Sequence, residues 1–321
     1  MPKELTIICP AHNAAAKIQP RLHSLETQYA LEKLKFVFVD DCSTDNTSEI
    51  IDAWCHNQDA HLIRNKTNCG PGFSRNAALR ETSTPYVAFV DADDWLHKQW
   101  SLDLISSIQK YDVEFIRSGF IEVHPKRRTA IICPNTPIGL MENPQHYIFP
   151  IGRTSAVDYR FSWAGVFQTD FLIDNNILFS ESVISCEDAM FVWKLHTKGS
   201  KFLASPSCYY YYNKIPAPVA SLTHTGKNSQ NDFIKAFNET FTYLELNHPQ
   251  WLVKAYRQFI ALVYFHLEKA NRLNPDCHKF LISQSRITLL KLHKEVKKQA
   301  LIDFSPDRLR LINKTLEIEF A

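Results

Sequence analysis

The stretch that decides the fold reads YVAFVDADDW and runs from Tyr86 to Trp95. Its first five residues form an unbroken apolar run, which predicts a strand buried on both faces of a sheet. Three carboxylates follow this run, at Asp91, Asp93 and Asp94. Helix capping accounts for one carboxylate at a strand end but not for three in one turn. The stretch therefore predicts a buried strand that places a cluster of acidic side chains at the edge of a sheet.

Similar apolar runs precede this strand, LTIIC at residues 5–9 and KFVFVD at residues 35–40, with a shorter one at residues 61–64. Helical segments separate these strands, at residues 20–27, 48–57 and 73–81. Strands that alternate with amphipathic helices predict an α/β domain with a mostly parallel, Rossmann-like sheet flanked by helices. The middle of the chain is less regular. We expect a loop or hairpin over residues 121–150, strands at 163–168, 201–203 and 208–213, and a helix at 187–198.

Beyond residue 225 the pattern changes to long helical periodicity, at residues 232–246, 251–273 and 277–301. The charge changes as well. Residues 1–225 hold 21 Lys and Arg against 24 Asp and Glu, whereas residues 226–321 hold 15 against 10. We therefore divide the chain into an α/β domain at residues 1–225 and a C-terminal helical region at residues 226–321.

The composition excludes several classes of protein. Hydrophobic residues make up 45% and charged residues 22% of the 321 residues, which is typical of a globular protein and not of a disordered chain. The eight cysteines stand singly without a CxxC pair, which argues against a disulfide scaffold or a zinc knuckle. Residues 1–9 lack the layout of a signal peptide, and the apolar runs are too short to span a bilayer. We expect a cytoplasmic protein.

Acidic side chains follow three of the expected strands, at the edge where open α/β sheets bind ligands. For Asp40 and Asp45 alone, helix capping is the preferred interpretation. The Asp91–Asp94 cluster instead predicts hard oxygen ligands for Mg²⁺ or Mn²⁺, held jointly with substrate phosphates. An NAD site is excluded because no GxGxxG follows the first strand, and no Walker A loop is present. A response-regulator receiver domain is excluded by the length of the chain.

Taken in order, four motifs resemble those of the inverting glycosyltransferases of family 2, which have the GT-A fold. They read ICPAHN at residues 8–13, VDDCSTDNT at 39–47, NCGPGFSRN at 68–76 and VDADDW at 90–95. A fifth, SCEDAMFVWKL at residues 185–195, resembles the acceptor-side Glu-Asp motif of the family. Each motif alone is weak, but together they cover the first 225 residues and are specific.

The resemblance implies a nucleotide-sugar site. Asp41 corresponds to the carboxylate that recognises the base, and an Asp can accept the imide N–H of uracil. Asp91 and Asp93 correspond to the Asp-x-Asp metal motif for Mn²⁺ or Mg²⁺, with Asp93 the expected direct ligand. Arg75 offers a charged fork for phosphate. The full set expected to bind the donor and its metal is Pro10, Ala11, Asn13, Asp41, Asn68, Gly70, Arg75, Asp91, Ala92 and Asp93.

On the acceptor side, the resemblance implies that Asp188 is the catalytic base. It would take the proton of an acceptor hydroxyl as that oxygen attacks the anomeric carbon, so that an α-linked donor gives a β-glycoside. The alternative for Glu187 and Asp188 is an acidic first helical turn. Further candidates for substrate contact are Glu187, Lys214, His224 (also a candidate metal ligand) and the aromatic residues Trp95 and Trp163, for which packing in the core is the alternative.

The C-terminal region has two interpretations. Lys291, Lys294, Lys297 and Lys298 lie beside leucine and valine in a basic amphipathic stretch, which suits peripheral contact with the inner face of the cytoplasmic membrane. Dimerisation or simple solvation is the alternative. The sequence thus predicts a metal-dependent glycosyltransferase that moves a sugar, from a UDP-sugar by expectation, to a glycan or lipid-linked acceptor in surface polysaccharide or lipooligosaccharide synthesis, without nucleic acid. The alternatives are a non-catalytic sugar- or nucleotide-binding module and a metal-dependent nucleotidyltransferase.

Overall fold

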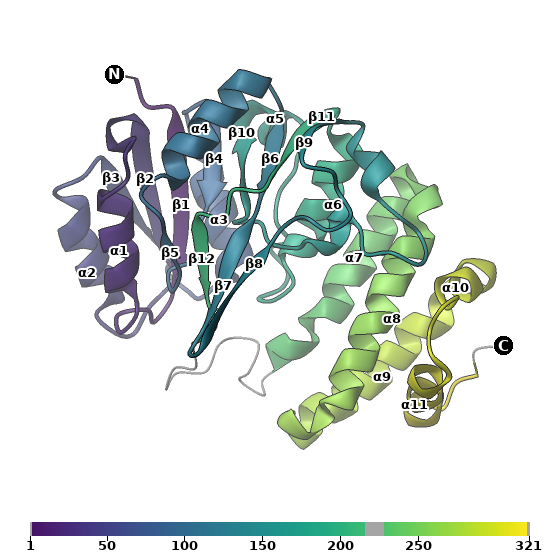
Figure 1. Cartoon of the computed structure of the whole chain (residues 1–321). Helices are drawn as coiled ribbons and strands as arrows, with labels where there is room; N and C mark the ends of the chain where they lie inside the picture. The colour runs from purple at the N-terminus through teal and green to yellow at the C-terminus, as the bar shows by residue number, and fades with distance from the viewer. Residues whose placement is uncertain (1, 216–227, 320–321) are drawn as a thin grey trace.

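A computed structural model describes residues 2–215 and 228–319 of the chain. A large mixed sheet forms its centre, with strand order β3-β2-β1-β4-β10-β6-β11-β9 (Figure 1). The strands of this sheet are β1 (Leu5–Ala11), β2 (Leu34–Asp40), β3 (Ala60–Arg64), β4 (Tyr86–Phe89), β6 (Phe115–Ser118), β9 (Gly139–Glu142), β10 (Gly165–Gln168) and β11 (Lys201–Ser205).

The N-terminal half of the large sheet is parallel. Strand β1 lies between β2 and β4, with Ile8 opposite Val37 on one side and Phe89 on the other. All seven residues of β1 are buried, because helices cover both faces of the sheet. The apolar runs expected at residues 5–9, 35–40 and 86–90 are therefore confirmed as buried parallel strands.

Strand β10 runs antiparallel between β4 and β6. Gly165 begins this strand, opposite Arg117 of β6. A Cβ atom on Gly165 would lie 1.9 Å from the carbonyl oxygen of Ile116, so only glycine permits this close approach of the two strands. The segment that precedes Gly165 is thereby directed toward the edge of the sheet where β1 and β4 end.

A second sheet of four strands has the order β5-β12-β7-β8. Its strands are β5 (Trp95–Leu96), β7 (Phe120–His124), β8 (Arg127–Ile131) and β12 (Tyr210–Asn213). Strands β7 and β8 form a hairpin that projects from the body of the molecule (Figure 1). This hairpin confirms the expectation for residues 121–150 in part, since β9 joins the large sheet instead.

Two apolar cores lie on opposite faces of the large sheet. One packs Ile7 and Phe36 of the sheet against helices α1 and α4. The other packs Ile8 and Phe89 against α3, α6 and the C-terminal helices. The helices of the α/β part are α1 (Ile18–Glu26), α2 (Thr47–Cys55), α3 (Gly70–Arg80), α4 (Trp100–Tyr111), α5 (Thr169–Asp174) and α6 (Asp188–Lys198).

The C-terminal part of the described chain is helical, as expected. It comprises α7 (Asp232–Asn247), α8 (Leu252–Glu268), α9 (Pro275–Lys291), α10 (Lys294–Ala300) and α11 (Pro306–Leu316). Phe237 and Phe259 of this region are fully buried in the same core as Trp193 of α6, so the helices pack on the α/β part. Helices α4, α5 and α11 were not expected from the sequence, and the single helix expected at residues 277–301 is divided into α9 and α10. The division of the chain at residue 225 stays a prediction, because the residues around it lie outside the described ranges.

Candidate active site

Three carboxylates stand where strand β4 ends, and the fold holds each differently. The carbonyl oxygen of Asp91 accepts hydrogen bonds from Nε and Nη2 of Arg21 in α1, at 2.9 and 2.6 Å. Asp94 is buried and accepts from the Tyr210 hydroxyl at 2.6 Å and from the Asn213 amide at 2.7 Å. Strand β12 thus holds the turn that carries the acidic cluster, through the hydrogen bonds that Asp94 accepts.

Arg75 connects this turn to the Glu-Asp motif. Its Nη2 donates to Oδ1 of Asp91 at 2.7 Å and its Nη1 donates to Oε1 of Glu187 at 2.6 Å. The Arg75 side chain is only 4% exposed. Gly72 makes this contact possible, because a Cβ there would lie 2.4 Å from the carbonyl oxygen of Ser180. Close packing of α3 on the 180–187 segment therefore joins two motifs that are far apart in the sequence.

The position of Arg75 in the structure differs from the one expected of a phosphate-binding residue. Helix α3 begins at Gly70, so Arg75 lies inside the helix and is buried, not at an exposed helix start. Both terminal nitrogens already donate to carboxylates. Contact between Arg75 and phosphate stays a prediction, and what the structure shows is an arginine that positions carboxylates.

Asp188 begins helix α6, beside this network. Burial and the neighbouring Glu187 charge together raise the pKa of its carboxyl to about 7, against the opposing effect of Arg160 and Arg75. Within the described part of the chain, no hydrogen-bond donor reaches the Asp188 carboxylate. A carboxyl group with a pKa near neutrality and free lone pairs is suited to accept a proton.

The C-terminal helices support this part of the site. Lys254 of α8 is 3% exposed, and its Nζ lies 2.6 Å from Oδ2 of Asp158. The amide of Gln258 donates to Oδ1 of the same carboxylate at 2.7 Å. Arg160, whose charge acts on Asp188, follows Asp158 by two residues. Helix α8 therefore anchors the segment that carries a charge facing the candidate base.

The loops after β1 and β2 form the expected donor side. The Asp41 carboxylate is buried and accepts from the amides of Cys69 and Gly70, at 2.9 and 2.7 Å, and from the Asn65 side chain at 2.8 Å. Its bonds thus fix the start of α3. The assignment of Asp41 to the nucleotide base stays a prediction, since three donors already occupy its oxygens.

His12 and Asn13 join the same two loops. The imidazole Nδ1 of His12 lies 2.8 Å from the carbonyl oxygen of Asp41, which can only accept, so Nδ1 carries the proton. Nε2 then accepts from the side-chain amides of Asn13 and Asn68, at 3.0 and 3.1 Å. Asn13 Oδ1 accepts from the Thr44 amide at 2.8 Å. The expected residues Asn13, Asn68 and Gly70 are therefore brought together, with Pro10 and Ala11 buried at the end of β1.

The Asp91 and Asp93 carboxylates fit the oxygen chemistry of a hard divalent cation. The Asp93 side chain is 46% exposed, and its nearest cation is Lys17 Nζ at 3.9 Å. Partial burial and the Asp91 charge raise the pKa of Asp93, a cost that a bound cation would offset. Among the described residues, no three His, Cys, Asp or Glu side chains form a complete metal site. Ala92 lies between the two carboxylates, and His224 lies outside the described residues.

The aromatic candidates differ in exposure. Trp163 is 5% exposed and stacks on Tyr210, with ring centroids 4.3 Å apart, so the structure places it in the core. Trp95 is half-buried and stacks on Tyr211 at 5.9 Å. The Lys214 Nζ donates to the Tyr212 hydroxyl at 2.8 Å and is exposed. The side chains of Trp95 and Lys214 are accessible to a ligand, whereas little of the Trp163 ring is accessible.

Sequence reasoning missed four residues that build the site, and a local signal existed for one. The signal for His12 is its position inside the ICPAHN motif, where the expected strand ends and a loop begins. Arg21, Tyr210 and Asn213 carried no such signal, since their partners are distant in the chain.

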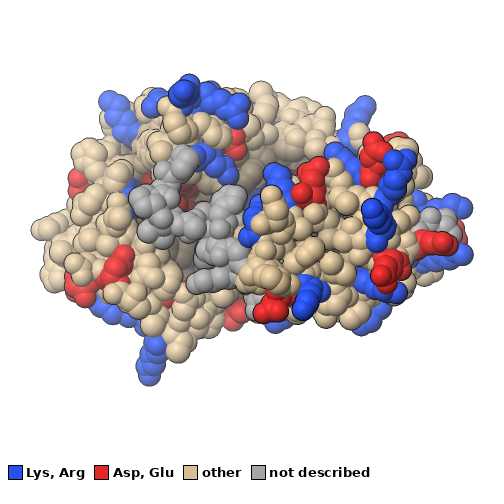
Figure 2. Space-filling model, turned by 90° about the horizontal axis from the view of Figure 1, so that it is seen from below, with Lys and Arg blue, Asp and Glu red and all other residues tan. Residues whose placement is uncertain are grey.

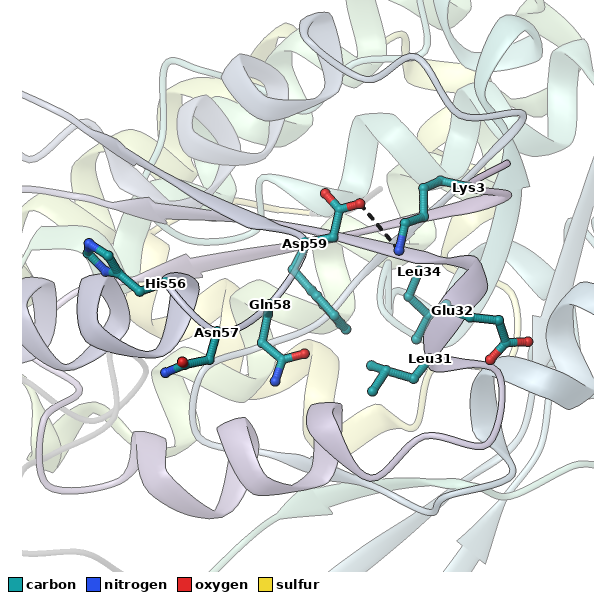
Figure 3. Close-up of a pocket in the computed structure, with 9 residues that line it drawn as sticks. Lys3, Leu31, Glu32, Leu34, His56, Asn57, Gln58 and Asp59 are labelled. Carbon is teal, nitrogen blue, oxygen red and sulfur yellow. Dashed lines mark ion pairs between the residues drawn. The ribbon is translucent and has the colours of Figure 1, made fainter. Parts of the chain in front are cut away.

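A hollow of about 570 Å³ lies elsewhere, at the amino ends of β2 and β3 (Figure 3). Lys3 and Asp59 form an ion pair at its rim, with 3.2 Å between Nζ and Oδ2. Leu34 begins β2, whereas Asp40 and Asp41 lie at the opposite, carboxyl end of that strand. This hollow is therefore separate from the candidate active site.

Comparison with known proteins agrees with this geometry. The family described as Glycosyl transferase family 2 matches residues 6–154, which hold the first four motifs. Residues 6–154 are a glycosyl transferase family 2 domain. The chain is 28% identical over 218 residues to poly(ribitol-phosphate) β-N-acetylglucosaminyltransferase TarS of Staphylococcus aureus, which covers 66% of this chain and 36% of TarS. A poly(ribitol-phosphate) β-glucosyltransferase of Bacillus spizizenii is 24% identical over 214 residues, 65% of this chain and 32% of that protein.

Solved structures confirm the GT-A fold of the chain. The crystal structure of residues 1–349 of S. aureus TarS in complex with UDP aligns with a TM-score of 0.72 at 20% identity, covering 98% of this chain and 88% of that one. The chain spans about a third of the length of the curated relatives that it matches.

No helix among the described residues is both long and apolar enough to cross a bilayer.

Proposed function

We propose that this glycosyltransferase moves a sugar from a UDP-sugar to a hydroxyl of a surface glycan, with inversion at the anomeric carbon. The observation that carries the proposal is the Asp188 carboxyl group, whose pKa is raised to about 7 beside the Arg75-linked carboxylates of Asp91 and Glu187. Catalytic carboxylates commonly combine such a raised pKa with a place in a charged cleft.

The residues divide the work as follows. Asp188 accepts the proton of the acceptor hydroxyl as its oxygen attacks the anomeric carbon from the side opposite the leaving UDP. Glu187 pairs with Arg75, and its charge helps to raise the pKa of Asp188. Asp91 and Asp93 would hold Mn²⁺ or Mg²⁺, which supplies positive charge beside the phosphates when bound. In-line displacement then yields a β-glycoside from an α-linked donor.

The donor assignment is supported by the structural neighbours. The TarS fragment has been solved with UDP and with UDP-GlcNAc, and both complexes align with this chain at TM-scores above 0.7. A mannosyltransferase of Pyrobaculum calidifontis, solved with GDP-Man and Mn²⁺, aligns at 0.52. UDP is therefore the first nucleotide to test, and Mn²⁺ the first metal.

The acceptor and the setting are proposed from the relatives. The two named relatives build β-linked sugars on poly(ribitol-phosphate), so a surface polysaccharide is the acceptor class that we propose. A cytoplasmic location follows from this role, with peripheral membrane contact through the basic residues of α9 and α10. Leu289 and Leu292 of that stretch are buried in the core, whereas Leu290 is exposed, so the lysines and Leu290 would make the contact.

Two other functions remain as alternatives. A non-catalytic binding module would bind UDP but turn nothing over. A nucleotidyltransferase would release pyrophosphate from a nucleoside triphosphate and has no need of a base at Asp188. The intact Asp91, Asp93 and Asp188 favour glycosyl transfer.

The test is a donor screen on the purified chain. UDP, GDP and CDP are titrated with and without Mn²⁺, and released UDP is then followed over a panel of UDP-sugars. We expect Mn²⁺-dependent UDP binding, loss of that dependence in Asp93→Asn, and slow hydrolysis of one UDP-sugar that EDTA abolishes. Binding of GDP or CDP alone would overturn the assignment of the base, and binding of no nucleotide would overturn the function.

A further inference from the structure

The tip of the β7–β8 hairpin carries a basic hollow that the proposed transfer reaction does not account for. Its volume is about 470 Å³. The residues that line it are Val123, His124, Pro125, Lys126, Arg127, Arg128 and Ile215. Lys126, Arg127 and Arg128 are consecutive and exposed. We call this feature the hairpin hollow.

The positive charge of the hairpin hollow is not balanced locally. Within residues 2–215 and 228–319, no carboxylate forms an ion pair with Lys126, Arg127 or Arg128. The nearby carboxylate of Glu122 faces His124, with 3.4 Å between Oε2 and Nε2. Exposed cations without partners keep their full charge for a ligand.

Strand β12 connects the hairpin hollow to the acidic turn of the candidate active site. Asn213 of this strand donates its amide to the Asp94 carboxylate, in the acidic turn. The next residue, Lys214, donates its amide to the carbonyl oxygen of Val123 in the hollow, at 2.9 Å. One residue therefore separates the support of the acidic turn from the lining of the hollow. Figure 2 views the molecule from below, the side toward which the hairpin projects in Figure 1, and shows Lys and Arg side chains spread over this face together with Asp and Glu side chains.

The shape of the hairpin hollow favours an anionic chain over a membrane as its occupant. A membrane surface is bound by basic residues together with apolar side chains that insert among the lipids. Here Val123 is 6% exposed, and Ile215 is the exposed large apolar residue of the described lining, at 47%. A concave surface that presents three consecutive cations suits successive phosphates of an extended chain.

We infer that the hairpin hollow binds phosphate groups of an anionic acceptor, a polymer of polyols joined by phosphodiesters, whose hydroxyl reaches Asp188. This inference rests on the proposed function for the reaction itself. Strand β8 is also the edge of its sheet, where charged side chains hinder pairing with other chains. That second role predicts aggregation on loss of charge and no change in acceptor affinity.

The experiment compares two variants with equal loss of charge. One combines Lys126→Gln, Arg127→Gln and Arg128→Gln, and its control combines Arg308→Gln, Arg310→Gln and Lys314→Gln in α11. Binding of a synthetic oligo(glycerol phosphate) is measured by calorimetry without donor, and its apparent KM is measured from UDP release. We expect the hairpin variant to weaken both about tenfold, as three exposed ion pairs of under 1 kcal/mol each would give. Donor hydrolysis without acceptor and the control variant stay as in the wild type.

Other results would overturn the inference. These are an unchanged affinity in the hairpin variant, an equal loss in the control, aggregation as its sole effect, or loss of binding to phosphatidylglycerol vesicles in place of the oligomer. An uncharged dextran fragment that matches the oligomer as acceptor would also overturn it. If the wild type hydrolyses no donor, the proposed function fails, while calorimetry still tests the hollow.

Discussion

Nη1 of Arg75 lies 2.6 Å from Oε1 of Glu187, across a separation of 112 residues in the chain. The other terminal nitrogen of Arg75 binds Asp91, so one buried cation ties the acidic turn to the helix that carries Asp188. The distance between the candidate metal ligands and the candidate base is therefore set by a side chain and not by the backbone alone.

Arg75→Met should destabilise the fold strongly. The substitution fills the volume but leaves Asp91 and Glu187 without a cation, and removing one partner of a buried pair costs about 3 kcal/mol or more. Urea unfolding measures the change. Arg80→Met is the matched control, because the Arg80–Glu181 pair is exposed and worth less than about 1 kcal/mol. Equal losses in the two variants would mean that the bridge contributes no more than a surface pair.

Asp188→Asn should abolish turnover while leaving the donor bound. An amide keeps the shape of the side chain but accepts no proton, and loss of a general base costs about 10²–10⁴ in kcat. UDP release with acceptor gives the rate, and calorimetry with UDP gives the affinity. Asp174→Asn, an exposed position in α5, serves as the control. A variant with normal kcat would exclude Asp188 as the base.

The pH profile should carry the signature of the same group. A base must be deprotonated to act, so kcat/KM should rise with pH and level off above about 7, the pKa of Asp188. Glu187 raises this pKa, so Glu187→Gln should move the midpoint of the rise to lower pH. Initial rates between pH 5 and 9 test both statements. An unmoved midpoint in Glu187→Gln would show that another group controls the profile.

Stability should depend on pH in the opposite sense. The pKa of Asp188 is raised from 3.8 to about 7 on folding, so the folded chain holds this proton more tightly. The associated stability is present below about pH 4 and is lost as the pH rises to about 7. Asp188→Asn removes this dependence, so the variant should be more stable than the wild type at pH 8. The urea unfolding midpoints of the two proteins at pH 5 and 8 test this prediction. A variant that is less stable than the wild type at pH 8 would contradict it.

Lys254→Met should loosen the contact between α8 and the segment at Asp158. Lys254 is 3% exposed, and its loss leaves Asp158 with Gln258 but without a cation, at a cost of about 3 kcal/mol. Thermal unfolding measures the loss. Lys201→Met removes an exposed pair with Asp112 and should change little. If both variants melt alike, α8 does not depend on this ion pair.

Much of the fold was predictable because its parallel strands are continuous apolar runs. Ile8, Val37 and Phe89 are buried in strands that helices cover on both faces. Strands of this kind are continuous apolar runs, which can be recognised from the sequence alone. Strand β10 was placed by the sequence, but its antiparallel position between β4 and β6 depends on packing across the sheet. The close approach at Gly165 that permits it has no local signal in the chain.

The candidate site was predictable as a set of residues and not as a network. The motifs named Asp91, Glu187 and Asp188, and the structure brings these together. The sequence assigned Arg75 to phosphate, whereas the structure pairs it with carboxylates, because its helix starts earlier and packs closer than the local pattern indicates. The pairing of Arg75 with Glu187 joins residues far apart in the chain, and neither local sequence contains a pattern that predicts it.

The antiparallel insertion of β10 also has a consequence for synthesis on the ribosome. Strands β4 and β6 are both buried in the finished sheet, yet each waits for residues 165–168 before its open edge is paired. A nascent chain that has not reached Gly165 therefore exposes two apolar edges, each able to pair with another chain. Between the emergence of residue 118 and that of residue 168, both of these edges are open at once, and we expect a chaperone to protect them in that interval.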